Sequence, residues 1–139
     1  MSGKTKKLTL VQAITESMHQ EMARDESIVV LGEDVGVDGG VFRATDGLIE
    51  AYGEERVMDT PLAESGIIGV SVGLAVTGYR PIAEIQFMGF IYPAINQILA
   101  HVARYRHRTK GKYPMPMVIR MPYGGGIHAP EHHSESYEA

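Results

Sequence analysis

The sequence predicts an α/β domain in which helices cover both faces of a parallel sheet. Two observations lead to this fold class. Short, continuously apolar runs alternate with longer segments whose apolar residues recur at helical spacing, and no linker or repeat interrupts this order. A strand that is apolar at every position is typical of a parallel sheet buried on both faces, and alternating strands and helices favour parallel crossover connections.

Local patterns set the bounds of the expected elements. Thr9 and Gln12 form a capping-box pattern before the first helix. Apolar residues every three or four positions mark the first and last long helices, and runs without polar residues mark the strands. In chain order we expect a helix over residues 10–24, a strand at 28–31, a short helix over 46–52, a strand at 56–59, a helix over 64–77, a strand at 81–87, a helix from about 91 to 106 and a strand at 115–120.

The helix expected over residues 64–77 carries three glycines, Gly66, Gly69 and Gly73, on one face. Each glycine costs roughly 1 kcal/mol relative to alanine inside a helix. We therefore expect close packing or a ligand against this face.

Composition limits the class of protein. The chain has 139 residues, of which 44% are hydrophobic and 22% charged, as in an ordinary globular domain. A net charge of −4 argues against a nucleic-acid binder, and the absence of cysteine gives no sign of secretion. No apolar stretch approaches the ~20 residues that span a membrane. A cytoplasmic protein is the simplest interpretation, or a matrix protein in a mitochondrion.

Glu64 has the most informative setting in the chain. It is the only charged residue between Asp59 and Arg80, and it lies where an expected strand gives way to a helix. Ligands of open α/β sheets bind at such junctions, and burial would raise the pKa of this carboxyl group so that it could share a proton with a ligand base. The alternative is that Glu64 only caps the first helical turn, where acidic residues are favoured.

Two other features follow expected strands. The segment Gly32-Glu33-Asp34-Val35-Gly36 places carboxylates after a buried strand, although the same residue types also form solvated turns. Phe87, Phe90 and Tyr92 form an aromatic cluster that is either core or a surface for a flat cofactor ring.

The C-terminal segment combines three glycines, at 124–126, with His128, His132 and His133. Glycine permits a close approach of the backbone to a ligand, and histidine titrates near neutral pH. This spacing matches no zinc pattern. A plain surface loop is the alternative to a ligand site.

A basic run lies at residues 104–112, where positive side chains alternate with tyrosine and threonine. Basic and aromatic residues together can hold phosphates, whereas cations at a helix end are also common on a solvated surface. A docking surface for a partner subunit is a third interpretation.

Taken together, five segments resemble one enzyme family. Gly32-Glu33-Asp34-Val35-Gly36, Gly39-Gly40-Val41-Phe42-Arg43, Asp59-Thr60-Pro61-Leu62-Ala63-Glu64, Glu84-Ile85-Gln86-Phe87 and the Gly-rich loop ending in His133-Ser134 occur in this order. The chain is similar, from about residue 8 to 139, to the β subunit of the thiamine-diphosphate-dependent, decarboxylating component of pyruvate and branched-chain 2-oxo-acid dehydrogenase complexes.

The resemblance implies roles for residues around the cofactor. Glu64 matches the glutamate that hydrogen-bonds the aminopyrimidine ring and favours its imino tautomer, which then removes the thiazolium C2 proton. Leu62 and Phe90 match residues that pack around the cofactor rings. Glu33 matches an acidic residue near the pyrimidine that takes part in proton communication between paired sites.

Other implied roles concern the substrate and a cation. His133 matches the active-site histidine of the family, and His128 is a second histidine on the substrate side. The carbonyl of Met117 corresponds to part of a structural site for a monovalent cation such as potassium.

The resemblance also implies partners. The α subunit, in an α2β2 heterotetramer, would supply most of the contacts to the magnesium and the diphosphate. The other partners are a 2-oxo acid and the lipoyl group of an acyltransferase core.

Residues 1–8 are expected to be an N-terminal extension and residues 9–139 an incomplete pyrimidine-binding domain, truncated before its end, without the second, C-terminal α/β domain. The isolated fragment would then be inactive. Acetoin dehydrogenase, a transketolase-like β subunit or a noncatalytic assembly module are the alternatives.

Overall fold

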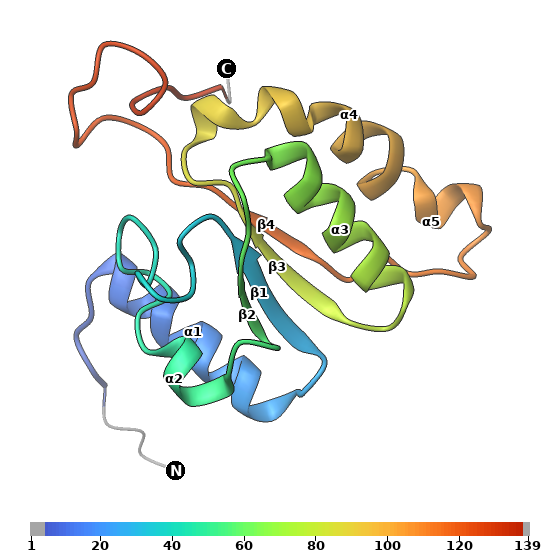
Figure 1. Cartoon of the computed structure of the whole chain (residues 1–139), viewed down its shortest axis with the longest axis horizontal. Helices are drawn as coiled ribbons and strands as arrows, with labels where there is room; N and C mark the ends of the chain where they lie inside the picture. Colours follow the sequence, from blue (N-terminus) through green and yellow to red (C-terminus); the bar gives the residue numbers. More distant parts are fainter. Residues whose placement is uncertain (1–4, 138–139) are drawn as a thin grey trace.

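The computed structural model describes residues 5–137, and it confirms the predicted fold class. Four parallel strands form one sheet in the order β2-β1-β3-β4 (Figure 1). The elements are α1 (Leu10–Arg24), β1 (Ile28–Gly32), α2 (Leu48–Tyr52), β2 (Val57–Asp59), α3 (Glu64–Val76), β3 (Arg80–Glu84), α4 (Ile95–Gln97), α5 (Tyr105–Arg108) and β4 (Val118–Arg120). Two 3₁₀ turns, Met88–Phe90 and Tyr92–Ala94, and a π-helical segment, Ile98–Val102, complete the list.

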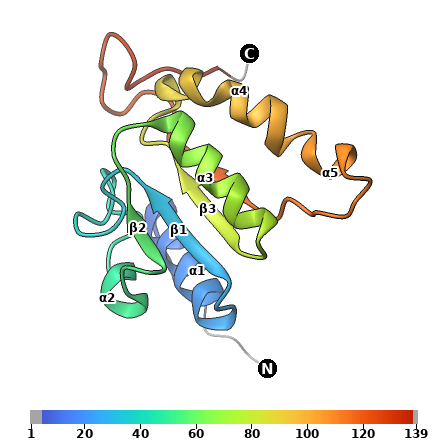
Figure 2. The ribbon, with the colours of Figure 1, turned by 45° about the vertical axis from the view of Figure 1, so that its right-hand side comes forward.

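Helices cover both faces of the sheet, as Figures 1 and 2 show. On one face, Met18 and Met22 of α1 pack with Val30 and with Leu48 of α2. On the other face, α3 and the segment that follows β3 pack against the sheet through a second apolar cluster. All five residues of β1 are buried, as expected for the inner strand of a covered parallel sheet.

The capping box at the start of α1 is confirmed. The amide of Gln12 donates to Thr9 Oγ1 at 3.2 Å, and the amide of Thr9 donates to Gln12 Oε1 at 3.0 Å. These two bonds satisfy backbone donors that the first helical turn leaves without partners.

The prediction of one continuous helix from about residue 91 to 106 is wrong. The chain there passes through 3₁₀, α and π geometry before the short helix α5, and Pro93 lies in the first turn of the second 3₁₀ segment. Among the apolar residues of this segment, Ile98 and Val102 pack against the second apolar cluster, but each piece is too short for apolar periodicity to distinguish helix types. The flanking strands are also shorter than expected, because β3 ends at Glu84 and β4 begins at Val118.

The glycine face of α3 is only partly packed. A side chain at Gly69 would meet the amide group of Gln97 at 3.7 Å, whereas nothing lies within 4 Å of a side chain at Gly73. Close packing that could offset the cost of a helical glycine is therefore present at Gly69 and is absent at Gly73 among the described residues.

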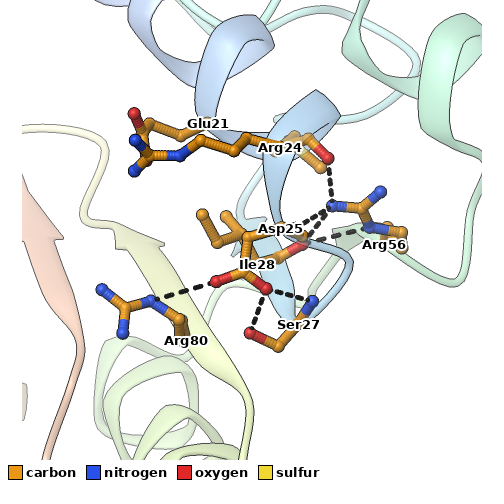
Figure 3. Close-up of polar contacts among 8 residues, drawn as sticks. Glu21, Arg24, Asp25, Ser27, Ile28, Arg56 and Arg80 are labelled. Carbon is orange, nitrogen blue, oxygen red and sulfur yellow. Dashed lines mark hydrogen bonds and ion pairs between the residues drawn. The ribbon is translucent and has the colours of Figure 1, made fainter.

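A polar network ties the elements together at the amino edge of the sheet (Figure 3). The Arg56 guanidinium donates to the carbonyls of Met22, Asp25 and Ile28 at 2.9 Å each. Asp25 accepts from the amide and hydroxyl of Ser27 and lies 3.5 Å from Arg80 Nε. The end of α1 and the starts of three strands are thereby joined, so this edge has a structural role.

The expected N-terminal extension and the expected absence of a membrane span can be compared with the structure only over residues 5–137. Residues 1–4 of the expected N-terminal extension lie outside the described residues, as do residues 138–139. Between residues 5 and 137, no helix has the length and apolar character needed to cross a membrane.

Candidate functional site

Charged residues gather at the carboxyl edge of the sheet, opposite the network around Arg56. Glu33 follows β1, and Glu64 begins the helix that follows β2. Glu84 ends β3 and Arg120 ends β4, where the two residues are paired in register. Open α/β sheets bind ligands at this edge, so these side chains define the candidate site.

Glu64 is a buried carboxylate at the first position of α3, with 9% of its surface exposed. The preceding residue, Ala63, has no side chain that could cap the helix. No ion pair or side-chain hydrogen bond between described residues includes the Glu64 carboxylate. Its oxygens are not among the fully enclosed polar atoms of the described residues that lack a partner, so the carboxylate keeps access to this edge of the sheet. This carboxylate is therefore available to a ligand.

Glu33 lies half-buried beside Glu64. Burial raises the pKa of Glu33 above its ordinary value, and the negative charges of Asp34 and Glu64 raise it further. Glu33 therefore binds a proton more readily than an exposed glutamate does. The negative charge of Glu64 therefore acts on Glu33, and the two carboxylates are coupled electrostatically at this edge.

The loop after β1 is anchored and is not a freely solvated turn. Asp59 accepts from the amides of Gly36 at 2.6 Å and Val37 at 3.2 Å. A Cβ atom at Gly36 would lie 2.7 Å from the Asp59 carboxylate, so a side chain there would displace Asp59 from these hydrogen bonds. The side chain of Gln86 donates to Asp34 at 3.1 Å, which joins this loop to the segment after β3.

An aromatic wall connects the segment after β3 to the C-terminal loop. The His133 ring meets Phe87 edge-on at 4.6 Å and Phe90 at 5.2 Å between ring centres. Phe42 meets Phe87 at 5.6 Å. Three of these rings border a cavity of about 360 Å³, which is lined by Phe42, Phe87, Pro122, Tyr123, Gly124, Gly126, Ile127 and His133.

Glu84 and Arg120 form a buried ion pair at the ends of two neighbouring strands. The side chains are 4% and 17% exposed, respectively, and their charged atoms are in contact, although without the alignment of a hydrogen bond. Burial lowers the pKa of the Arg120 guanidinium. The segments that line the aromatic cavity leave the sheet directly after these two residues, so the pair fixes where both segments begin.

The structure brings together four of the predicted site residues and separates others. Glu33 and Glu64 lie in each other's field, and Phe90 and His133 are in contact. Phe90 also packs against the apolar cluster that contains Ile67 and Ile68 of α3, the helix that Glu64 begins. Leu62 is 72% exposed, and its role in packing around the cofactor rings stays a prediction.

The predicted aromatic cluster is divided. Phe87 is buried and Phe90 half-buried, whereas Tyr92 is exposed and meets Tyr137 at 4.9 Å. His128 is exposed, has a positive φ of 57° and does not line the aromatic cavity. The role of Met117, which precedes β4, stays a prediction. In residues 5–137, no group of three or more histidine, aspartate or glutamate side chains is arranged to hold a metal ion.

Sequence reasoning missed three residues of this edge. Asp59, Phe42 and Arg120 each contact a residue that is distant in the sequence. Local sequence patterns do not reveal such contacts. The position of Arg120 at the end of an apolar strand was the available signal, since a charged residue there must find an opposite charge.

Comparison with known proteins identifies the domain. The family model described as the pyrimidine-binding domain of transketolase matches residues 6–139. The chain is 56% identical to pyruvate dehydrogenase E1 component subunit beta of Acholeplasma laidlawii over 131 residues, 94% of this chain. It is 54% identical to 3-methyl-2-oxobutanoate dehydrogenase subunit beta of Mycobacterium tuberculosis over all 139 residues. It is 55% identical to 2-oxoisovalerate dehydrogenase subunit beta of Bacillus subtilis over 132 residues, 95% of this chain.

The chain spans about 40% of the length of each of these relatives. The resemblance predicted from the five sequence segments is thus confirmed over nearly the whole chain. The chain belongs to the transketolase pyrimidine-binding domain family, and it is similar to part of the β subunits of pyruvate and branched-chain 2-oxo-acid dehydrogenases.

Proposed function

We propose that this chain forms the pyrimidine side of a thiamine diphosphate site in the β subunit of a decarboxylating 2-oxo-acid dehydrogenase. The observation that carries the proposal is Glu64, which begins α3 with 9% of its surface exposed and has a carboxylate that is neither paired with a described residue nor fully enclosed. An ionised carboxylate can accept hydrogen bonds from a ligand that reaches this edge of the sheet. A ring nitrogen of an aminopyrimidine would give Glu64 the partner that it lacks.

The residues present fit the pyrimidine end of the cofactor. When bound, thiamine diphosphate supplies the carbon nucleophile that decarboxylation of a 2-oxo acid requires. Glu64 would share a proton with the ring nitrogen that it faces, and thereby control the tautomer of the ring. Glu33, whose pKa is raised beside Glu64, would hold or return that proton. Leu62 and Phe90 would flank the cofactor, and the exposed Leu62 would become covered.

His133 would act on the substrate side of this site. Its imidazole meets Phe87 and Phe90 edge-on at the wall of the aromatic cavity, and the residue is exposed to a ligand on its other side. A positioned imidazole can donate or accept a proton at an oxygen atom of a 2-oxo acid or during acyl transfer to a lipoyl group. His128 is a weaker candidate for the same role because it lies outside the cavity.

The proposal assigns the diphosphate and its magnesium to an α subunit in an α2β2 assembly. The residues at this edge are carboxylates, aromatic rings, a histidine and Arg120, which is already paired with Glu84, and no metal-binding group of three acidic or histidine side chains lies within residues 5–137. The relatives are named for pyruvate and for branched-chain 2-oxo acids at nearly equal identity. Identity therefore supports the substrate class and does not distinguish its members. An acyltransferase core with lipoyl groups would accept the acyl product.

Calorimetric titration with thiamine diphosphate and Mg²⁺ tests the divided site. This chain alone should show no tight binding, whereas a full-length β subunit that contains it should bind tightly once an α subunit is added. An α subunit alone serves as the control. Tight binding by the isolated chain would contradict the proposal, because the described residues would then hold the whole cofactor.

A further inference from the structure

A basic surface on and after α5 is the strongest feature that the proposed function leaves unused. Five of the 13 lysine and arginine residues lie within residues 104–112, which contain none of the 17 acidic residues. The other eight positive and 17 negative side chains give the rest of the chain a formal charge of −9. Surfaces that serve only solubility intersperse the two signs. In this chain the positive charge is instead concentrated in one segment.

The basic surface consists of exposed side chains that lack acidic partners. No ion pair among residues 5–137 includes a residue of this segment. Arg108 and Lys112 each lie over a tyrosine ring, at 5.1 and 5.2 Å from its centre, which restricts their charged groups. Arg106 and Lys110 have no side-chain hydrogen bond to a described residue. The members of the basic surface are Arg104, Arg106, His107, Arg108, Lys110 and Lys112.

The charged groups without partners border a hollow of about 410 Å³. Arg106, His107 and Lys110 line it together with Ala103 and Gly111. Lys110 and Gly111 both have positive φ, and the Gly111 amide donates to the Arg106 carbonyl at 2.8 Å. This closed turn fixes the backbone that carries Lys110 next to the backbone that carries Arg106. The two positive charges are therefore presented from a defined scaffold.

The basic surface lies far from the candidate active site. Figures 1 and 2 show α5 at the opposite end of the molecule from the loop after β4, which carries His133. A partner bound at α5 would thus leave the carboxyl edge of the sheet open.

We propose that the basic surface docks a carboxylate-rich polypeptide segment of a partner protein. Opposite charges across an interface accelerate association and select the partner, so a surface with five positive and no negative side chains favours an acidic partner. A short acidic segment can contact the surface formed by residues 104–112 without extending beyond it. A nucleic acid strand would extend beyond it and meet the remainder of the chain, whose formal charge is −9.

Fluorescence anisotropy with a labelled oligoglutamate peptide tests this proposal on the chain itself. The test variant is Arg106→Gln with Lys110→Gln. The control variant is Lys6→Gln with Arg24→Gln, which removes the same charge from exposed residues that are already paired with Glu16 and Glu21. At low ionic strength the test variant should bind the peptide about tenfold more weakly than the unaltered chain, since each exposed pair contributes modestly and salt screens it. The control should change affinity less than about threefold.

Three outcomes would overturn the proposal. The first is an equal loss in the control variant, which would show attraction by net charge alone. The second is no measurable binding of the peptide at low ionic strength. The third is tighter binding of a single-stranded RNA of the same charge, lost in the test variant, which would make the surface a nucleic-acid interface. Unchanged circular dichroism of both variants confirms that the substitutions leave the fold intact.

Discussion

Breaking the buried ion pair between Glu84 and Arg120 should destabilise the chain strongly, whereas replacing both partners should not. Removing one member of a buried pair leaves an uncompensated charge and typically costs about 3–5 kcal/mol. The Glu84 side chain is 4% exposed and that of Arg120 17%. Arg120→Met leaves Glu84, the more buried of the two charges, without a partner and should cost about 5 kcal/mol, the upper end of this range. Glu84→Gln leaves the less buried Arg120 without a partner and should cost about 3 kcal/mol, the lower end.

The double substitution Glu84→Leu with Arg120→Met separates this reasoning from simple loss of packing. Apolar residues of similar volume remove both charges together, so the double variant should lie within about 1 kcal/mol of the unaltered chain. Urea unfolding followed by circular dichroism measures all three free energies, and an unchanged m value shows that the same surface is exposed on unfolding. The exposed pair of Lys6 and Glu16, 3.4 Å apart, is the control, and its loss should cost less than about 1 kcal/mol.

The double variant also supplies the result that would refute the reasoning. If its loss of stability equals the sum of the two single losses, the charges do not compensate each other. A cost below about 1 kcal/mol for Arg120→Met would likewise show that Glu84 reaches water or another partner.

Two further predictions concern the ends of the sheet. The pKa of Glu33 is raised in the folded chain, so the folded state gains stability below the ordinary glutamate pKa and loses it as pH rises through the raised value. Glu33→Gln should therefore raise the urea midpoint at neutral pH and lose this advantage in acid; a constant difference across pH would contradict it. At the other edge, Arg56→Met removes donors to three carbonyls and should destabilise the chain by about 2–4 kcal/mol. Urea unfolding measures this, and a loss below about 1 kcal/mol would show that water replaces the guanidinium.

The arrangement of the sheet could be predicted from the sequence because it depends on local pattern. Residues 28–31 are apolar without interruption, and the capping box at Thr9 sets the start of α1. The irregular helix after residue 91 could not be predicted, since its 3₁₀, α and π segments are only three to five residues long, too short for apolar spacing to distinguish one helix type from another. The strand bounds near Glu84 and Val118 depend on pairing between β3 and β4, which is a nonlocal property.

The candidate site divides in the same way. The setting of Glu64 could be interpreted locally, as a single charge between a strand and an apolar helix. Its proximity to Glu33 depends on the adjacent, parallel positions of β1 and β2. The meeting of Phe42, Phe87 and His133 joins three distant segments, and only the folded chain reveals it.

The central claim is that Glu64 controls the proton chemistry of a bound pyrimidine, and C2 proton exchange of thiamine diphosphate tests it most directly. The measurement requires a full-length β subunit assembled with its α subunit. Glu64→Gln keeps the shape of the side chain and should slow exchange by about 10²–10⁴-fold. His133→Ala should leave exchange within a few-fold and lower turnover instead, and Glu50→Gln, at an exposed position of α2, should change neither. Exchange at the unaltered rate in Glu64→Gln would show that Glu64 is only a helix cap and would contradict the account.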